Sequence, residues 1–239
     1  MNSFFRKILG LGPVEPMNVP KRYKSTVIQN REELKGSINE SSIFPLLISE
    51  RTNEIDFDND LIRLFHGREG MFGRILITSV VDSGEEKDMF HIKSAKMDQP
   101  TFDYICDIAS KNLDNRQLQP WKFWNPSDSK FEFQILSADV SVFTSERILS
   151  KTHMLEAHKI LKSESLVVSI PRRGLIFVCK KGLETQFFNE FVAVHAAALM
   201  DNKVDMDILC EDLFIVENGE VTATLPAHNL SEALFNCYK

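Results

Sequence analysis

The second half of the chain contains two pairs of β-rich segments, one on each side of a long amphipathic helix. The first pair, 166–170 and 175–179, is joined by Pro171-Arg-Arg-Gly174, whose composition is typical of a turn. The second pair, 213–216 and 221–225, is joined by a segment containing Asn218-Gly219. Asn-Gly is the strongest short hairpin signal because both residues tolerate positive φ. Two hairpins are therefore expected here.

The helix between the hairpins is predicted from Glu184 to about Asn202, with Phe187, Phe191, His195 and Leu199 at steps of four. An isolated hairpin is only marginally stable in water, so the two hairpins and the helix should fold together. We expect an α+β fold, with an antiparallel or mixed sheet and helices packed on one face, ending in a β-β-α-β-β unit.

Other elements follow from caps, periodicity and turn residues. The first half should contain a helix after Asn30, an edge or irregular strand at 43–48 that includes Pro45, strands at 71–81 and 89–93, and a helix at 99–113. Later come a strand at 131–136, a helix from Thr144 or Ser145 to about Lys162 with Ile148, Thr152 and Leu155 facing inward, and a closing helix from Asn229.

The first 25 residues differ from the rest in charge and proline content. Residues 1–24 carry five basic side chains and one acid, a net charge of +4. The whole chain has a net charge of −6, so the remaining residues together carry −10. We expect residues 1–25 to form a flexible basic arm and 26–239 a single α+β body, with a sub-boundary within 115–130. The arm could also touch an acidic partner or a membrane surface.

Charge and cysteine usage limit the classes of partner and compartment. A negative body argues against broad nucleic-acid binding, which needs clustered Lys and Arg. The four cysteines form no CxxC pair, which favours reduced thiols in the cytoplasm. The longest apolar-rich segment, 191–200, is about half the length of a membrane span. We expect a cytoplasmic protein without a transmembrane segment, and its oligomeric state stays open.

An acidic run provides the one candidate for metal chemistry. Asp56, Asp58 and Asp60 alternate along the chain, and His66 follows them. A calcium loop needs Gly at its sixth position and Glu at its twelfth, where this chain has Leu61 and Gly67. Capping of a helix by Asp58 or Asp60 explains the run without a metal, and we favour it. The alternative is a divalent-metal site in which His66 assists acid–base chemistry.

Two further groups of residues could contact a protein partner. Trp121, Phe123 and Trp124 lie between two prolines, so they form either an exposed recognition patch or a loop held to the core by its aromatic rings, which we favour. Arg172 and Arg173 at the tip of the first hairpin could hold an anion or an acidic partner, although a solvated turn is the simpler interpretation.

The histidines and short motifs do not indicate catalysis. His153 and His158 are five residues apart, so they would diverge on a helix rather than share a metal, and His195 is expected to be a hydrogen-bonded core residue. The sequence contains no GxSxG elbow, no GxGxxG and no Walker-type motif. No cofactor is expected.

Several C-terminal segments resemble a bacterial family of unknown function. The segment Ser145-Glu-Arg-Ile-Leu, the hairpin from Ser165, the long helix, and Leu213-Phe-Ile-Val-Glu-Asn-Gly-Glu look like the YtpQ-like proteins, mainly over residues 140–225. Phe44-Pro-Leu-Leu-Ile and the helix near 100–113 also resemble segments of that family and occur in the same order along the chain. With them, the resemblance spans residues 43–225, approximately. The resemblance implies a bacterial cytoplasmic protein and supplies no catalytic residues.

The sequence therefore favours a non-enzymatic binding or regulatory protein that acts through protein–protein contacts. The alternative is a metal-dependent, hydrolase-like enzyme that uses the acidic cluster at 56–60 with His66.

Overall fold

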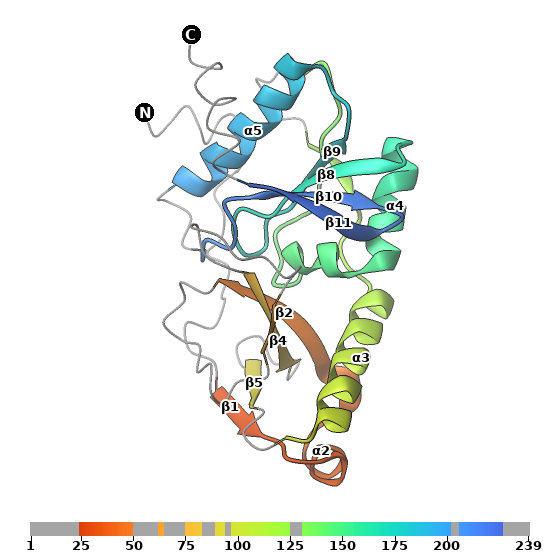
Figure 1. Cartoon of the computed structure of the whole chain (residues 1–239), viewed down its shortest axis with the longest axis vertical. Helices are drawn as coiled ribbons and strands as arrows, with labels where there is room; N and C mark the ends of the chain where they lie inside the picture. Colours follow the sequence, from red (N-terminus) through yellow and green to blue (C-terminus); the bar gives the residue numbers. More distant parts are fainter. Residues whose placement is uncertain are drawn as a thin grey trace. The chain divides into compact units, whose positions relative to one another are not determined.

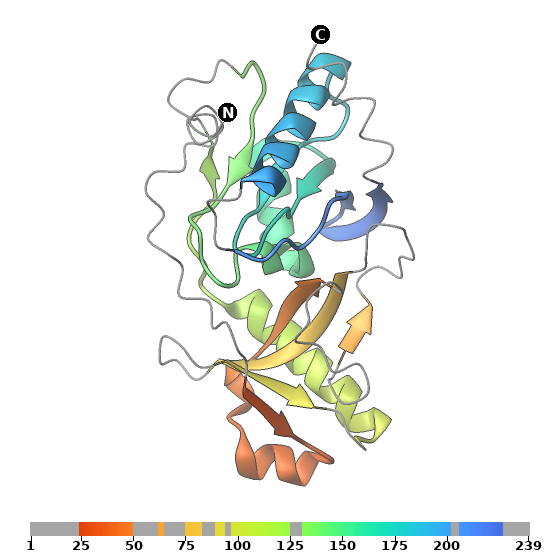
Figure 2. The same ribbon diagram turned by 90° about the vertical axis from the view of Figure 1, so that its left-hand side faces the viewer.

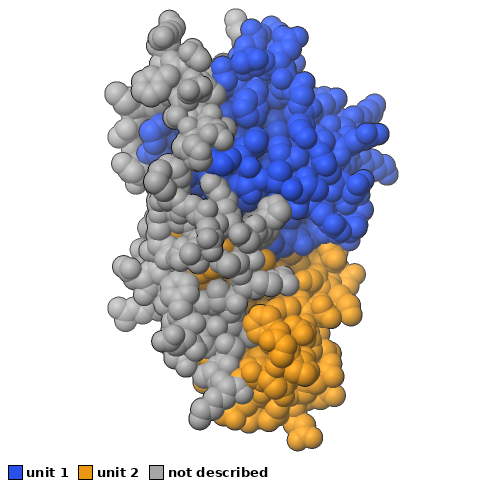
Figure 3. Space-filling model, viewed as in Figure 1, with its two compact units in different colours: residues 1–17, 118–239 blue, residues 18–117 orange. Residues whose placement is uncertain are grey.

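The computed structural model describes residues 24–49, 62–64, 75–82, 89–93, 97–124, 131–201 and 206–226. These residues form two compact units, coloured separately in Figure 3. Unit 2 contains the described residues up to 117, and unit 1 contains those from 118 onward. A single body over 26–239 was expected from the sequence, and the observed division after Gln117 falls inside the expected sub-boundary at 115–130. The predicted α+β fold is confirmed.

Unit 1 is built on a six-stranded antiparallel sheet. Its strands are β6 (Lys122–Phe123), β7 (Leu136–Ser137), β8 (Ser165–Ser169), β9 (Phe177–Lys180), β10 (Leu213–Glu217) and β11 (Glu220–Leu225). They are arranged in the order β11-β10-β8-β9-β7-β6. Strands β8 to β11 are labelled in Figure 1. Both predicted hairpins are present, and the pairing of β8 with β10 joins them in one sheet, as expected.

Two helices bury the central strands of this sheet. Helix α5 (Thr185–Met200) packs its Phe191 and Val194 against residues such as Val167 of β8 and Ile215 of β10. Helix α4 (Lys151–Leu161) lies against β9. Every residue from Leu166 to Ser169 is buried, although successive residues of a strand point to opposite faces. Both faces of these strands are therefore covered, whereas the sequence analysis expected helices on one face.

The predicted helix from Thr144 or Ser145 is interrupted at Ser150. A 3₁₀ helix, η2 (Ser145–Leu149), precedes it, and the extended Ser150 then caps α4 by accepting a hydrogen bond from the His153 amide at 3.2 Å. This break changes which face of α4 points inward. The expected inward residues Thr152 and Leu155 are exposed, and the buried ones are His153, Met154, Ala157 and Leu161.

The predicted strand over 131–136 is mostly wrong, because only Leu136 within it belongs to a strand, β7. Phe131 and Phe133 point their rings into an aromatic cluster, and the Ile135 carbonyl accepts a hydrogen bond from the Trp124 amide at 2.8 Å. Aromatic composition therefore predicted a strand where the chain instead bends at Glu132 and Phe133.

Unit 2 combines a five-stranded sheet with helices. Its elements are β1 (Lys24–Val27), α2 (Arg31–Ser37), η1 (Glu40–Ser42), β2 (Ile43–Ser49), β3 (Ile62–Leu64), β4 (Ile75–Asp82), β5 (Met89–Lys93) and α3 (Gln99–Asn115). The order is β1-β5-β4-β2, with β3 also on β4, and only β1 and β5 pair in parallel. Strand β2, which contains Pro45, ends this sheet in the part of the chain that the structure describes, as predicted for an edge strand.

Capping residues set the helix starts of unit 2. The Asn30 side chain accepts hydrogen bonds from the amides of Glu32 and Glu33 at 3.1 and 3.0 Å, and the Asp98 side chain accepts one from Thr101 at 2.8 Å. Helix α3 then lies along the sheet (Figure 2), with its buried face packed into the apolar core. That core contains Ile28, Leu34, Ile43, Ile92, Ile105 and Ala109.

None of the helices in the described residues combines the length and the apolar character that a membrane span requires. Helix α5 is the most apolar of them, and its side chains are used for packing against the sheet of unit 1.

The turn between β10 and β11 packs closely on the start of α4, and substitution of Gly219 tests this contact. Gly219 has φ +79°, and a Cβ added there would lie 2.8 Å from the Lys151 carbonyl oxygen. Gly182 is the control, since its φ is +84° and no atom lies within 4 Å of an added Cβ. We expect Gly182→Ala to lower the free energy of unfolding by about 1 kcal/mol through backbone strain alone. Gly219→Ala should cost about 1–3 kcal/mol more, because a backbone atom must also move.

Urea unfolding of both variants measures this difference. Equal losses would mean that the turn does not pack closely on the start of α4.

Candidate functional site

Trp121 anchors the start of the aromatic segment in unit 1. It is 8% exposed, and its indole Nε1 donates a hydrogen bond to the His153 carbonyl oxygen at 3.3 Å. The Arg147 guanidinium lies 4.6 Å from the centre of its ring, a cation–π contact. Burial lowers the pKa of Arg147 to about 10, which the charge of Glu156 partly opposes. Trp121 is thus a structural anchor, as the favoured interpretation of this loop predicts.

Trp124 anchors the other end of the segment. Its ring stacks on Phe131 at 5.7 Å between centroids and meets Phe177 of the core edge-on at 5.4 Å. Between the two tryptophans lies the two-residue edge strand β6, whose Phe123 is 47% exposed. Each of the two interpretations left open by the sequence therefore applies to part of the segment. Trp121 and Trp124 hold the loop to the core, and Phe123 is exposed to solvent.

The contacts of Trp124 continue into a longer series of rings. Phe131 meets Phe133 at 5.5 Å, and Phe133 meets Phe187 in the first turn of α5 at 5.7 Å. We call Trp124, Phe131, Phe133 and Phe187 the aromatic row. All four residues are partly buried, so each keeps some accessible surface. The sequence analysis did not identify this row, although Phe131 and Phe133 two residues apart were a visible signal.

Two carboxylates accompany the aromatic row. Glu132 is exposed between Phe131 and Phe133, and Glu190 lies one turn after Phe187 on α5. Burial raises the pKa of Glu190, and the negative charge of Glu132 raises it further. The two carboxylates therefore repel each other beside the row, and a positive charge placed between them would be stabilised.

Arg172 is 6% exposed, so the expected solvated hairpin tip is wrong. Its guanidinium donates three hydrogen bonds, from Nε to the Ala198 carbonyl at 2.7 Å, from Nη2 to Leu199 at 2.6 Å and from Nη1 to Met206 at 2.7 Å. The last carbonyls of a helix have no partner within the helix, and Arg172 supplies donors to the end of α5. Burial lowers its pKa, which the charges of Asp201 and Asp207 partly oppose.

Arg173 is 1% exposed and is also buried rather than available on a turn. Its Nε lies 3.5 Å from Asp207 Oδ2, and its Nη1 lies 3.9 Å from Oε1 of the fully buried Glu146. Neither nitrogen has a hydrogen-bond partner among the described residues. These contacts are ionic and hold the β8–β9 connection to two other segments of unit 1, which leaves no solvent-facing anion site at the pair.

His195 is a core residue, as predicted. It is 2% exposed, its Nδ1 lies 2.8 Å from the Ser169 hydroxyl oxygen, and its Nε2 lies 3.0 Å from the Glu211 carbonyl. The carbonyl can only accept, so Nε2 carries the proton and Nδ1 accepts from Ser169. Burial lowers the pKa of His195 to about 4, although the bond to Glu211 raises it slightly. This serine–histidine pair is closed off from any substrate, because Ser169 is also fully buried.

The remaining metal-site candidates are not brought together where the structure describes them. On α4, His153 is buried, whereas His158 is partly buried and binds the carbonyl of Ser163. Within the described ranges, no group of three or more His, Cys, Asp or Glu side chains could hold a metal ion. Asp56, Asp58, Asp60 and His66 lie outside those ranges, as does most of the basic arm, so the hypotheses about them stay predictions.

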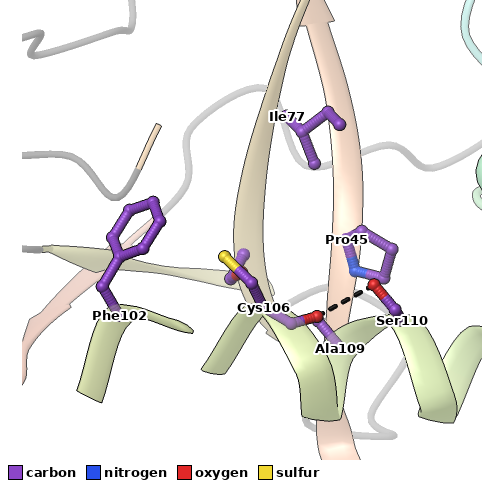
Figure 4. A pocket seen from close by; sticks show the side chains of 7 residues that line it. Pro45, Ile77, Phe102, Cys106, Ala109 and Ser110 are labelled. Carbon is purple, nitrogen blue, oxygen red and sulfur yellow. Dashed lines mark hydrogen bonds between the residues drawn. The ribbon is translucent and has the colours of Figure 1, made fainter. Parts of the chain in front are cut away.

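Unit 2 contains a small pocket between α3 and the sheet (Figure 4). It is lined by Pro45, Ile77, Ser79, Phe102, Cys106, Ala109 and Ser110. Its volume of about 10 Å³ is close to the least that holds one water molecule. The Ser110 hydroxyl donates to the Cys106 carbonyl at 2.9 Å within α3. The pocket is too small for a substrate or a cofactor.

Comparisons with protein-family models, with curated proteins and with solved structures found no match to this chain. The resemblance to the YtpQ-like proteins therefore stays a prediction, and the function is argued from the site geometry.

The buried neutral state of His195 gives a pH prediction. Its pKa is lowered in the folded protein, so the unfolded chain binds more protons between the ordinary histidine pKa of about 6.5 and about 4. The free energy of unfolding should therefore fall as the pH falls through this window, by about 3 kcal/mol from this residue. His195→Gln keeps a donor and an acceptor without titrating there, and it should lose this part of the pH dependence.

Urea unfolding of both proteins at a series of pH values tests this. Identical slopes for the wild type and His195→Gln would contradict a buried neutral histidine.

Proposed function

We propose that this protein is a non-enzymatic binding protein that receives a basic, apolar segment of a protein partner along the aromatic row. The observation that carries the proposal is the continuous contact of four partly exposed rings from the edge of the sheet to α5. Aromatic side chains are enriched in protein interfaces, where they provide large contact areas at low entropic cost.

The row is pre-organised for binding. Trp124 is fixed by the hydrogen bond from its backbone amide to the Ile135 carbonyl and by its ring contact with Phe177, and Phe187 is fixed on a helix. Rings that are already held in place lose little conformational freedom when a partner arrives, so more of the contact energy contributes to affinity.

The flanking carboxylates select the chemistry of the partner. A lysine or arginine near Glu132 and Glu190 would relieve their mutual repulsion and favour the ionised form of Glu190. Such a cation could also lie over a ring face of the row. The partner segment is therefore expected to combine apolar and basic side chains, and an acidic or nucleic-acid partner would be repelled.

Three polar residues of unit 1 have structural roles. Arg172, His195 and Ser169 are buried, and each is hydrogen-bonded within unit 1. The alternative of a metal-dependent, hydrolase-like enzyme concerns residues 56–60, which lie outside the described residues, so it stays a prediction. The resemblance to the YtpQ-like proteins would place this binding protein in the bacterial cytoplasm, and that location is part of the proposal.

The test is site-specific photo-crosslinking in cells with benzoylphenylalanine in place of Phe133. The matched control replaces Leu155, which is 45% exposed on α4 of the same unit. We expect a discrete crosslinked protein from position 133 and none from position 155. Glu132→Lys combined with Glu190→Lys should weaken binding of that protein by at least about tenfold, since close charge pairs contribute 1.5 kcal/mol or more.

Crosslinking at neither position, or equally at both, would contradict the proposal. A crosslink from position 123 alone would show that the partner contacts Phe123 and not the aromatic row. If the double lysine variant bound as tightly as the wild type, the partner would not be selected by its positive charge.

A further inference from the structure

The turn between β10 and β11 places a reactive backbone amide beside a histidine. Asn218 and Gly219 form the two-residue loop, with φ of 52° and 79°. The Gly219 amide donates a hydrogen bond to Nε2 of His158 on α4 at 3.3 Å, although the two residues are 61 positions apart. Asn218 is exposed, so its side chain is free to turn toward the following amide.

The hydrogen bonds of His158 select one tautomer of its ring. Its Nδ1 lies 2.7 Å from the Ser163 carbonyl oxygen, which can only accept, so Nδ1 carries the proton. Nε2 must then be the unprotonated nitrogen, because it accepts from Gly219. A neutral imidazole with its lone pair directed at an N–H is arranged as a general base, and the bond to Ser163 orients it.

We propose that Asn218 is a site of self-catalysed deamidation in which His158 acts as the general base. His158 Nε2 removes the proton of the Gly219 amide, and that nitrogen attacks Cγ of the Asn218 side chain to close a five-membered succinimide. The Cγ–Nδ2 bond breaks, and the side-chain nitrogen leaves as ammonia after receiving the proton from His158. Water then opens the ring at either carbonyl, giving aspartate or isoaspartate at position 218.

The histidine and the attacking side chain would approach the Gly219 amide from different directions. The N–H bond lies in the plane of the peptide group, so His158 occupies the edge of the amide. The Cγ atom approaches the nitrogen from the face of that plane, where an exposed side chain can move. Glycine at position 219 adds no Cβ to obstruct the approach, and the close Lys151 carbonyl excludes any larger residue there.

The product would change the edge of the sheet. Isoaspartate adds one atom to the backbone of a two-residue turn whose shape matches the twist of its strands. Either product also adds a negative charge between Glu217 and Glu220, which already pair with Lys181 and Lys151 at 3.2 and 2.6 Å. The modification would therefore weaken the pairing of β11 with β10, slowly and irreversibly.

The experiment incubates the purified full-length protein at neutral pH and follows position 218 by peptide mapping with mass spectrometry and enzymatic detection of isoaspartate. His158→Gln is the matched variant, since its side-chain oxygen still accepts from Gly219 but has no basicity. We expect wild-type protein to form isoaspartate at 218, and His158→Gln to do so at least about tenfold more slowly. Asn218→Gln provides the blank for the peptide assignment.

A second measurement separates the effect of His158 from the intrinsic reactivity of the Asn218-Gly219 sequence. In urea the histidine leaves the turn, so wild type and His158→Gln should react at the same rate, and the folded wild type should react faster than either. Equal or faster reaction of folded His158→Gln would overturn the proposal. So would slower reaction of the folded wild type than of the unfolded chain.

Discussion

Three hydrogen bonds from one buried guanidinium hold unit 1 together at the point where its long helix ends. Arg172 joins the β8–β9 connection to the last carbonyls of α5 and to the Met206 carbonyl. Two backbone hydrogen bonds complete the junction. The Arg173 amide donates to the Asp207 carbonyl at 2.9 Å, and the Leu209 amide donates to the Pro171 carbonyl at 3.0 Å. Without Arg172, the carbonyls at the end of α5 would be buried without donors, which is more costly than losing an exposed ion pair.

This arrangement explains why Arg172, Arg173 and His195 have structural roles in unit 1. Arg172 and Arg173 lie under the segment 206–209, and His195 joins α5 to the Glu211 carbonyl. These residues connect α5, the β8–β9 connection and the segment 206–211, which strand pairing does not hold together. In unit 1, Phe123 is exposed and the residues of the aromatic row are partly buried, and the proposed function is placed at the row.

The sequence predicted features that depend on local chemistry. The Asn218-Gly219 hairpin, the Asn30 cap and the edge position of Pro45 all follow from the preferences of single residues. It did not predict the break at Ser150, because a serine inside a helical pattern can either continue the helix or cap a new one. It also placed Arg172 and Arg173 in solvent, since charged turn residues usually are exposed and their burial depends on distant carbonyls. The aromatic row needed α5 to bring Phe187 next to Phe133, which lies far away in the sequence.

The most direct test of this account is the free energy of unfolding of Arg172→Met, measured with urea beside Lys151→Met. Both variants lose one positive charge, but the Lys151 pair with Glu220 is exposed by more than half on both side chains. The account predicts a loss of about 3 kcal/mol or more for Arg172→Met, with faster hydrogen exchange at the end of α5, and less than about 1 kcal/mol for Lys151→Met. Similar small losses in both variants would contradict the claim that Arg172 holds unit 1 together.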